Sequence, residues 1–338
     1  MRECVWRAEK LMARDEIESL VNTGQDVRDT FPLADVFLNA DDKGSIDNSV
    51  RRTVAILFGH PFETPTIDEM GMQYAYGAAL RSSDLSRQVG YAACTADGQV
   101  LAVGTNEVAK AGGGFYWSGF DNDARDFRVV ESDEPNAEMK LSILKELLEN
   151  LRNEGLLTNE GGVDDEMVSV TAQKLKSSRF WSITEYGRAV HAEMGVITDA
   201  ARRGVALQDA AMYGTTFPCH NCAKHVVASG IRRLVYIEPY PKSQVARLFR
   251  DSIDLEGTTP GKVHLQPFVG IAPSRFREFF VMGDRKDTNG RIISWDESKQ
   301  SAQPRIQNDP QSYIRRERGS VEQLGKILAS AGVRFRES

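Results

Sequence analysis

His191 and Glu193 stand two positions apart, and the run Pro218-Cys219-His220-Asn221-Cys222 follows them further along the chain. Imidazole nitrogens and thiolates are preferred ligands of Zn²⁺, and a catalytic zinc site usually has three protein ligands and one open position for water. His191, Cys219 and Cys222 would fill the three protein positions. A bound zinc ion lowers the pKa of its water towards about 7, which makes hydroxide available at neutral pH. The spacing therefore predicts a Zn²⁺ site capable of hydrolysis.

Glu193 is the residue that we expect to carry protons at this site. Replacing the exocyclic amine at C4 of a cytosine ring requires protons for the ring nitrogen and for the leaving ammonia, so a carboxylate must lie beside the metal without binding it. At the first turn of a helix, His191 can reach the metal while Glu193 lines the pocket. The positive N-terminal ends of two helices would stabilise thiolate and hydroxide. The combined pattern resembles the signature of zinc-dependent nucleoside deaminases.

Simpler interpretations of the Cys-x-x-Cys pair are half of a structural zinc site and a redox motif. A closed structural site would need a fourth ligand, but the remaining cysteines, Cys4 and Cys94, are isolated in the sequence. His220 lies between the paired cysteines and His225 lies three positions after Cys222. We expect both histidines to be ordinary polar positions.

The composition describes a globular chain of 338 residues, 41% hydrophobic and 27% charged, with room for one large domain or two smaller ones. No stretch approaches the length of a membrane span and the N-terminus is charged, so we expect a cytoplasmic protein without a membrane partner. Four cysteines, two of them predicted metal ligands, leave no disulfide framework. The formal net charge of −6 disfavours a polyanionic nucleic acid as the main substrate.

Residues 1–65 read differently from the rest of the chain. The pattern predicts a charged helix at Arg2–Leu20, a short strand at Ala34–Asn39, a turn-rich stretch at Ala40–Ser49, a helix at Arg51–Phe58 and a boundary at Pro61–Thr66.

Alternating helices and strands begin at Ile67. The patterns predict a helix at Met70–Leu80, followed by strands at Val89–Thr95 and Val100–Gly104. An insertion follows at about 107–190, with a helix at Glu138–Leu151. After the insertion, helices and strands alternate: His191–Arg203 (helix), Ala211–Thr215 (strand), Cys219–Ser229 (helix), Arg233–Ile237 (strand), Gln244–Arg250 (helix) and Val263–Val269 (strand). This order implies an α/β fold with a mainly parallel sheet covered by helices. The predicted domains are 1–65, 66–285 and a polar tail at 286–338 with basic Arg315–Arg318 and a helix at Val321–Ala329.

Several runs of the chain resemble the deoxycytidylate deaminase family: Ala78–Gly90, Gly104–Asn106, His191–Glu193 and Pro218–Lys224. Three more, Gly112–Trp117, Glu238–Ser243 and Phe268–Pro273, resemble the bacterial anti-phage dCTP deaminases more closely. The resemblance covers about residues 67–285. It implies a cytidine deaminase-like fold, a three-layer α/β/α sandwich with a large insertion, and Zn²⁺ as cofactor.

Such proteins resemble two-part chains with a P-loop kinase-like region ahead of the deaminase. Here Arg14-Asp15 and Ala34–Asn39 look like the last part of that region. No Gly-x-x-x-x-Gly-Lys-Ser/Thr phosphate loop occurs in this sequence. The resemblance therefore implies an N-terminal remnant that lacks most of the kinase-like domain, and we predict neither kinase activity nor triphosphate hydrolysis.

The resemblance also implies substrate contacts around the zinc site. Asn106 would hydrogen-bond the deoxyribose and the substrate edge, which fits its place just after a strand; a turn conformation is the alternative. Lys110 and the glycines Gly112–Gly114 could approach a phosphate through backbone amides, although glycine runs also serve as flexible loops.

Tyr240 and Lys242 follow the predicted strand at Arg233–Ile237, at the edge where ligands bind in parallel sheets. Lys242 is the preferred phosphate contact, with a solvated surface lysine as the alternative. Ala192 and Thr216 complete the predicted substrate-binding residues, and Arg275 is a weaker candidate.

The resulting hypothesis is hydrolytic deamination of dCTP, dCMP or both to the uracil nucleotide and ammonia. The resemblance implies that depletion of dCTP starves a replicating phage. It also implies that the chain forms a homo-oligomer (dimer or hexamer) and that a small RNA restrains its activity. The basic tail could contact such an RNA or be a solvated appendage.

One alternative is a deaminase of cytosine or adenosine within RNA or single-stranded DNA, which would need basic and aromatic strand contacts. The other is a zinc scaffold without turnover, which would not require Glu193.

Overall fold

A computed structural model describes residues 30–40, 43–129, 135–157, 161–176, 178–281, 283–295, 304–305 and 310–330. The described residues form two compact units, one from residues up to 39 together with 65–274, the other from 40–64 together with 275 onward. The helix predicted at Arg2–Leu20 and the Arg14-Asp15 pair lie outside the described residues. The domain boundaries at 65 and 285 stay predictions.

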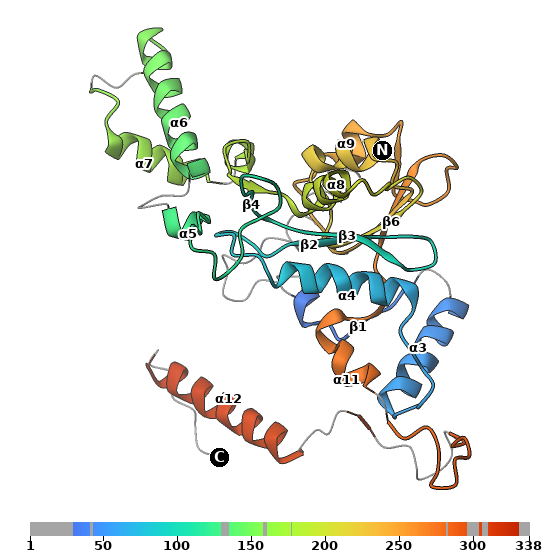
Figure 1. Ribbon diagram of the computed structural model, residues 1–338. Coiled ribbons are helices and arrows are strands. Elements are labelled where there is room, and N and C mark those ends of the chain that lie inside the picture. Colours follow the sequence, from blue (N-terminus) through green and yellow to red (C-terminus); the bar gives the residue numbers. More distant parts are fainter. Residues whose placement is uncertain are drawn as a thin grey trace. The chain divides into compact units, whose positions relative to one another are not determined.

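A six-stranded sheet forms the centre of the first unit (Figure 1). Its strand order is β3 (Val100–Thr105), β2 (Gly90–Cys94), β6 (Ala211–Thr216), β7 (Arg233–Glu238), β9 (Val263–Pro267) and β8 (Ile253–Asp254). The strand β2 runs antiparallel to both of its neighbours, while β6, β7, β9 and β8 are parallel to one another. The predicted mainly parallel sheet is confirmed, with an antiparallel β2–β3 hairpin at one edge.

Helices cover both faces of this sheet (Figure 1). Helices α8 (Ala192–Arg203) and α9 (His220–Ala228) lie on one face, and α4 (Ile67–Ala79) lies on the other. The apolar residues form two clusters, one between the sheet and α8 with α9, the other between the sheet and α4. Strand β2 is buried along its whole length because both faces are covered. The predicted three-layer α/β/α sandwich is confirmed.

Local signals fix the ends of the covering helices. Helix α4 begins with a capping box in which the Thr66 side chain accepts from the Glu69 backbone and Glu69 accepts from the Thr66 backbone. The buried Glu69 carboxylate also accepts a 2.8 Å hydrogen bond from the Ile271 backbone N–H. Ile271 belongs to β10 (Gly270–Ile271), which pairs antiparallel with β1 (Val36–Phe37). The strand predicted at Ala34–Asn39 is thus a two-residue strand.

The insertion is folded and is closed at its base. Strand β4 (Glu107–Val108) pairs antiparallel with β5 (Ala189–Val190), so the two ends of the insertion meet directly before His191. Between them lie α5 (Asp126–Val129), α6 (Pro135–Asn153), α7 (Asp165–Lys174) and the 3₁₀ turn η2 (Arg179–Ser182). Helices α6 and α7 pack through Leu144, Leu148 and Val168.

The remaining elements are η1 (Phe31–Leu33), α10 (Val245–Leu248), η3 (Pro273–Arg275), and in the second unit α3 (Lys43–Leu57), α11 (Phe276–Phe280) and α12 (Pro310–Ser330). The turn-rich stretch predicted at Ala40–Ser49 is wrong from Lys43 onward, because α3 starts there. Residues such as Gly44 and Ser45 favour helix starts as well as turns, and here they occupy the first helical turn. No helix within the described ranges has the length and apolar character needed to cross a bilayer.

Candidate active site

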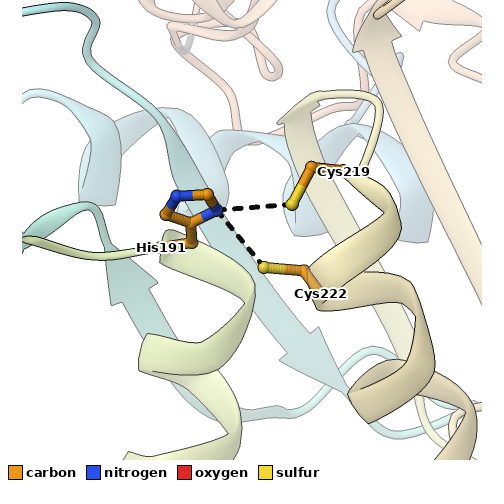
Figure 2. Close-up of side chains that lie close together, drawn as sticks. All are labelled: His191, Cys219 and Cys222. Atoms are coloured by element: carbon orange, nitrogen blue, oxygen red, sulfur yellow. Dashed lines mark hydrogen bonds between the residues drawn. The ribbon is translucent and has the colours of Figure 1, made fainter. Parts of the chain in front are cut away.

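His191, Cys219 and Cys222 converge at the N-terminal ends of α8 and α9 (Figure 2). Nδ1 of His191 lies 3.4 Å from Sγ of Cys219 and 3.4 Å from Sγ of Cys222. All three ligand atoms lie within 4.8 Å of one another. The histidine approaches from one helix and both sulfur atoms from the other (Figure 2).

This donor set fits zinc. Around a tetrahedral Zn²⁺ with bonds of about 2.0–2.3 Å, a nitrogen and a sulfur ligand lie about 3.5 Å apart, which matches the separations between His191 and the two sulfur atoms. In the described part of the chain the group has three members, neither His220 nor His225 among them. Three ligands leave a fourth tetrahedral position for a ligand that is not protein, as in catalytic zinc sites.

The local chain geometry explains why these residues meet. His191 is the N-cap of α8 and Cys219 is the N-cap of α9, both in extended conformation. Cys222 lies in the first turn of α9 and points to the same side as Cys219. The N–H groups at both helix starts place partial positive charge beside the thiolates.

Hydrogen bonds among the three ligand groups shift their pKa values. A hydrogen bond with the Cys222 thiol, and a further one with His191, lower the pKa of Cys219 to about 4. The pKa of Cys222 is raised because its hydrogen bond to Cys219 and its burial favour the thiol. The hydrogen bond with Cys219 raises the pKa of His191 to about 9. A metal that binds here must displace the protons of Cys222 and His191, so zinc binding releases protons.

Glu193 lies in the first turn of α8, two residues after His191, where it interacts with Cys219 and Cys222. Its side chain is 5% exposed, and burial raises the pKa of its carboxyl to about 7, with the negative charge of Cys219 acting in the same direction. The carboxyl does not belong to the described metal-ligand group. A buried carboxyl next to a metal site without being a ligand is the arrangement that proton transfer requires.

Asn106 is buried between two strands and binds the preceding loop. Its Oδ1 accepts from the Val89 backbone N–H at 2.8 Å, and its Nδ2 donates to the Arg87 backbone carbonyl at 2.6 Å. The carboxamide therefore holds the 87–89 segment in place. Its predicted contact with deoxyribose stays a prediction.

Lys110 and the glycine run form a tight turn. The Lys110 backbone N–H donates to the Gly114 carbonyl, and the Gly113 N–H donates to the Lys110 carbonyl. Arg81 stabilises the end of this turn, because its Nη2 donates to the Tyr116 carbonyl at 3.0 Å and its guanidinium lies 3.7 Å from the centre of the Trp117 ring. The phosphate contact of Lys110 stays a prediction.

The other predicted substrate residues fall at the carboxyl edge of the sheet. Ala192 is the first residue of α8 and is fully buried, and Thr216 ends β6. Tyr240 and the exposed Lys242 follow β7, in a turn closed by the Ser243 backbone N–H and the Tyr240 carbonyl. Their roles stay predictions. Arg275, the weaker candidate, pairs with Glu278 and is grouped with the second unit.

Sequence reasoning missed three residues around the zinc-binding loop. Arg87 forms an ion pair with Glu238 and lies 3.4 Å from the Thr216 hydroxyl. Tyr91 donates from its hydroxyl to the Thr216 carbonyl, and Ser243 donates to the Pro218 carbonyl at 2.9 Å. Arg87 and Ser243 lie in runs that carry the family resemblance, but the pairing of residues so distant in sequence leaves no local signal.

Comparison with known families decides what kind of site this is. The family model "Cytidine and deoxycytidylate deaminase zinc-binding region" matches residues 65–238, just over half of the chain. The chain belongs to this family. The match includes all three metal ligands and Glu193, and the cofactor of the site is Zn²⁺.

Individual relatives match shorter parts. The deoxycytidylate deaminase of Enterobacteria phage T2 is 39% identical over 83 residues, which are 25% of this chain and 42% of the relative. The deoxycytidylate deaminase of phage T4 is 47% identical over 55 residues, 16% of this chain and 28% of the relative. The chain thus spans less than half the length of these curated relatives. The solved dCMP deaminase of cyanophage S-TIM5, in complex with dCMP and dUMP, is 14% identical and covers 61% of this chain and 100% of its own, with a TM-score of 0.34.

Proposed function

We propose that this chain is a zinc-dependent deaminase that converts dCMP, dCTP or both to the deoxyuridine nucleotide and ammonia. The observation that carries the proposal is the buried Glu193 carboxyl beside the group of His191, Cys219 and Cys222. A structural zinc site has four protein ligands and needs no such carboxyl. Membership of the deaminase family and the partial match to phage deoxycytidylate deaminases support the reaction class.

Zinc bound to these ligands supplies a Lewis acid that makes a water molecule acidic at neutral pH. The residues of the chain provide the rest. Glu193 takes one proton of the attacking water and passes it to the ring nitrogen next to C4. It then takes the remaining proton from the hydroxyl group on C4, which becomes the uracil carbonyl, and delivers that proton to the departing amine. Because Glu193 is almost fully buried, bulk water does not compete for these protons. The atoms balance as cytosine plus water giving uracil plus ammonia.

The residues at the carboxyl edge of the sheet serve binding in this proposal. Asn106 orients the sugar, while Lys242, Tyr240 and the turn at Lys110 meet the phosphates. In support, the 2.9 Å hydrogen bond from Ser243 to the Pro218 carbonyl holds the turn of Tyr240 and Lys242 against the segment that leads to Cys219. A lysine in this turn would select nucleotides over nucleosides by pairing with their phosphates.

We further propose that the reaction depletes dCTP during phage infection, on the resemblance to anti-phage dCTP deaminases. A cytoplasmic location, assembly into dimers or hexamers and restraint by a small RNA remain parts of this proposal. The exposed basic residues of α12, Arg315, Arg316 and Arg318, are the surface on which an RNA contact can be tested.

The test is product formation by the zinc-loaded chain with dCMP, dCTP, deoxycytidine, a cytosine-containing single-stranded DNA and the matching RNA, each supplied separately. We expect uracil nucleotide and equimolar ammonia from dCMP or dCTP, and little from the other three. Turnover of the oligonucleotides in preference to the free nucleotides would overturn the substrate assignment. A zinc-loaded protein that leaves all five untouched would contradict the enzyme assignment.

A further inference from the structure

The segment from Thr216 to Pro218 joins the end of β6 to the zinc ligand Cys219. Each of its three residues forms a hydrogen bond with a different segment of the chain. The Thr216 carbonyl accepts from the Tyr91 hydroxyl on β2. The Phe217 N–H donates to the Glu238 carbonyl of β7 at 2.7 Å. The Pro218 carbonyl accepts from the Ser243 hydroxyl at 2.9 Å, beyond β7.

The Tyr91 ring is held in this position by its packing against β6. Its side chain is completely buried, and it sits opposite Gly214 in the β2–β6 register. The ring covers Gly214 so closely that a Cβ atom on that glycine would lie 2.2 Å from Cζ of Tyr91. The glycine thus makes room for the ring, and the ring aims its hydroxyl at the carbonyl two residues further along β6.

The two hydroxyls act on the carbonyls that flank Phe217. A strand end normally leaves its last carbonyls without a ladder partner, and a buried carbonyl without a partner is costly. Here Tyr91 and Ser243 satisfy them and fix the planes of the peptide groups that join Thr216 to Phe217 and Pro218 to Cys219. The side chain of Cys219 follows directly, so its direction depends on these planes.

We propose that Tyr91 and Ser243 are positioning residues that preorganise Cys219 for zinc. Neither hydroxyl is a metal ligand, and each acts through a backbone carbonyl. Groups that orient metal ligands in this way commonly change metal affinity about 10-fold to 100-fold when removed. The inference rests on the zinc site of the proposed enzyme, but zinc release can be followed without any turnover.

The chain offers matched controls for both changes. Tyr213, on the neighbouring strand β6, is a side chain as fully buried as Tyr91. Its hydroxyl donates a 2.8 Å hydrogen bond to Asp68 on the opposite face of the sheet. Ser229 donates to the Val226 carbonyl at the end of α9, away from the metal ligands. Removal of either hydroxyl costs a partly buried hydrogen bond without touching the 216–218 segment.

The experiment measures the rate at which zinc passes from the full-length, zinc-loaded protein to an excess of a chromogenic chelator. We expect Tyr91→Phe to release zinc about tenfold faster than the wild type, and Ser243→Ala to accelerate release in the same direction. Tyr213→Phe and Ser229→Ala should release zinc at the wild-type rate. Thermal unfolding of the zinc-free proteins should show similar losses for Tyr91→Phe and Tyr213→Phe.

The proposal is wrong if Tyr91→Phe releases zinc at the wild-type rate, or if Tyr213→Phe accelerates zinc release as much as Tyr91→Phe does. Either result would mean that the Tyr91 hydroxyl contributes only to general stability. If Tyr91→Phe does not fold, Ser243→Ala against Ser229→Ala decides the question by the same readout. Failure of the wild-type protein to deaminate nucleotides would leave these zinc-release rates unaffected, so the two proposals fail separately.

Discussion

The two faces of the central sheet use the same kind of residue for different purposes. Tyr91 and Tyr213 are both completely buried, and they lie on adjacent strands with their rings in opposite core clusters. On the α4 face, the Tyr213 hydroxyl donates to Asp68, which also receives both Nη atoms of Arg233. On the face of α8 and α9, the Tyr91 hydroxyl donates to the backbone that leads to the zinc ligand.

The difference lies in how charge is balanced. On the α4 face, Asp68 and Arg233 neutralise each other, and the Tyr213 hydroxyl donates a further hydrogen bond to Asp68. On the other face, Glu193 is buried beside Cys219 and Cys222, and the positive charge that partly offsets its burial comes from His191. The α4 face thus balances its carboxylate with an arginine, whereas the other face uses protons on His191 and Cys222 that zinc must displace when it binds. Such sites give up stability for function.

The largest expected effect is loss of the metal from the α8 and α9 face. Cys222→Ser removes a thiolate ligand, so we expect loss of zinc and of all deaminase activity, because no site for water activation remains. Zinc content and thermal unfolding with and without a chelator check this. The wild-type melting temperature should fall on chelation, since a ligand that binds the native state stabilises it. A chelator that lowers the melting temperature of Cys222→Ser just as much would contradict the assignment of this ligand.

A moderate effect is expected on the α4 face. Asp68→Asn leaves Arg233 without its carboxylate, and we expect a loss of about 1–2 kcal/mol in the free energy of unfolding with zinc content unchanged. Burial alone would raise the pKa of Asp68, but the hydrogen bond and charge of Arg233 outweigh it and the pKa lies below 3.8.

The sign of the pH dependence follows from that lowered pKa. The stabilisation by Asp68 is fully present above the ordinary carboxyl pKa of 3.8 and is lost as the pH falls through the lower pKa of the folded state. Denaturant unfolding at a series of pH values should therefore show a smaller acid-side loss of stability in Asp68→Asn than in the wild type. Identical pH profiles for the two proteins would refute this role for the pair.

The smallest effect is expected at the edge of the zinc-bearing face. Lys242→Gln should raise KM for dCMP or dCTP about threefold to tenfold with little change in kcat, because an exposed lysine contributes a charge-assisted contact to the phosphate. Deoxycytidine has no phosphate, so its kinetics should not change. Lys174→Gln, which changes another exposed lysine at the end of α7, is the matched control. An equal loss for deoxycytidine would remove Lys242 from the phosphate site.

The sequence predicted the layers, and it predicted as zinc ligands three residues that the structure brings close enough to hold a metal, because both predictions depend on local signals. A histidine or cysteine directly before apolar residues at helical spacing can be placed at the start of a helix from these neighbouring residues alone. The start of α3 was predicted wrongly because Gly44 and Ser45 serve turns and helix starts alike. The contact of Tyr91 with Thr216 joins residues 125 positions apart, and no short pattern encodes it. The same holds for Arg87 and Glu238, 151 positions apart.

The most direct test of the account combines zinc content with nucleotide turnover for Glu193→Gln. The substitution keeps the shape of the side chain but removes its ability to accept and deliver protons. We predict the zinc content of the wild type and a loss of dCMP and dCTP deamination of at least about 10²-fold. Turnover within a few-fold of the wild type, with zinc fully bound, would contradict the claim that this face of the sheet works through Glu193.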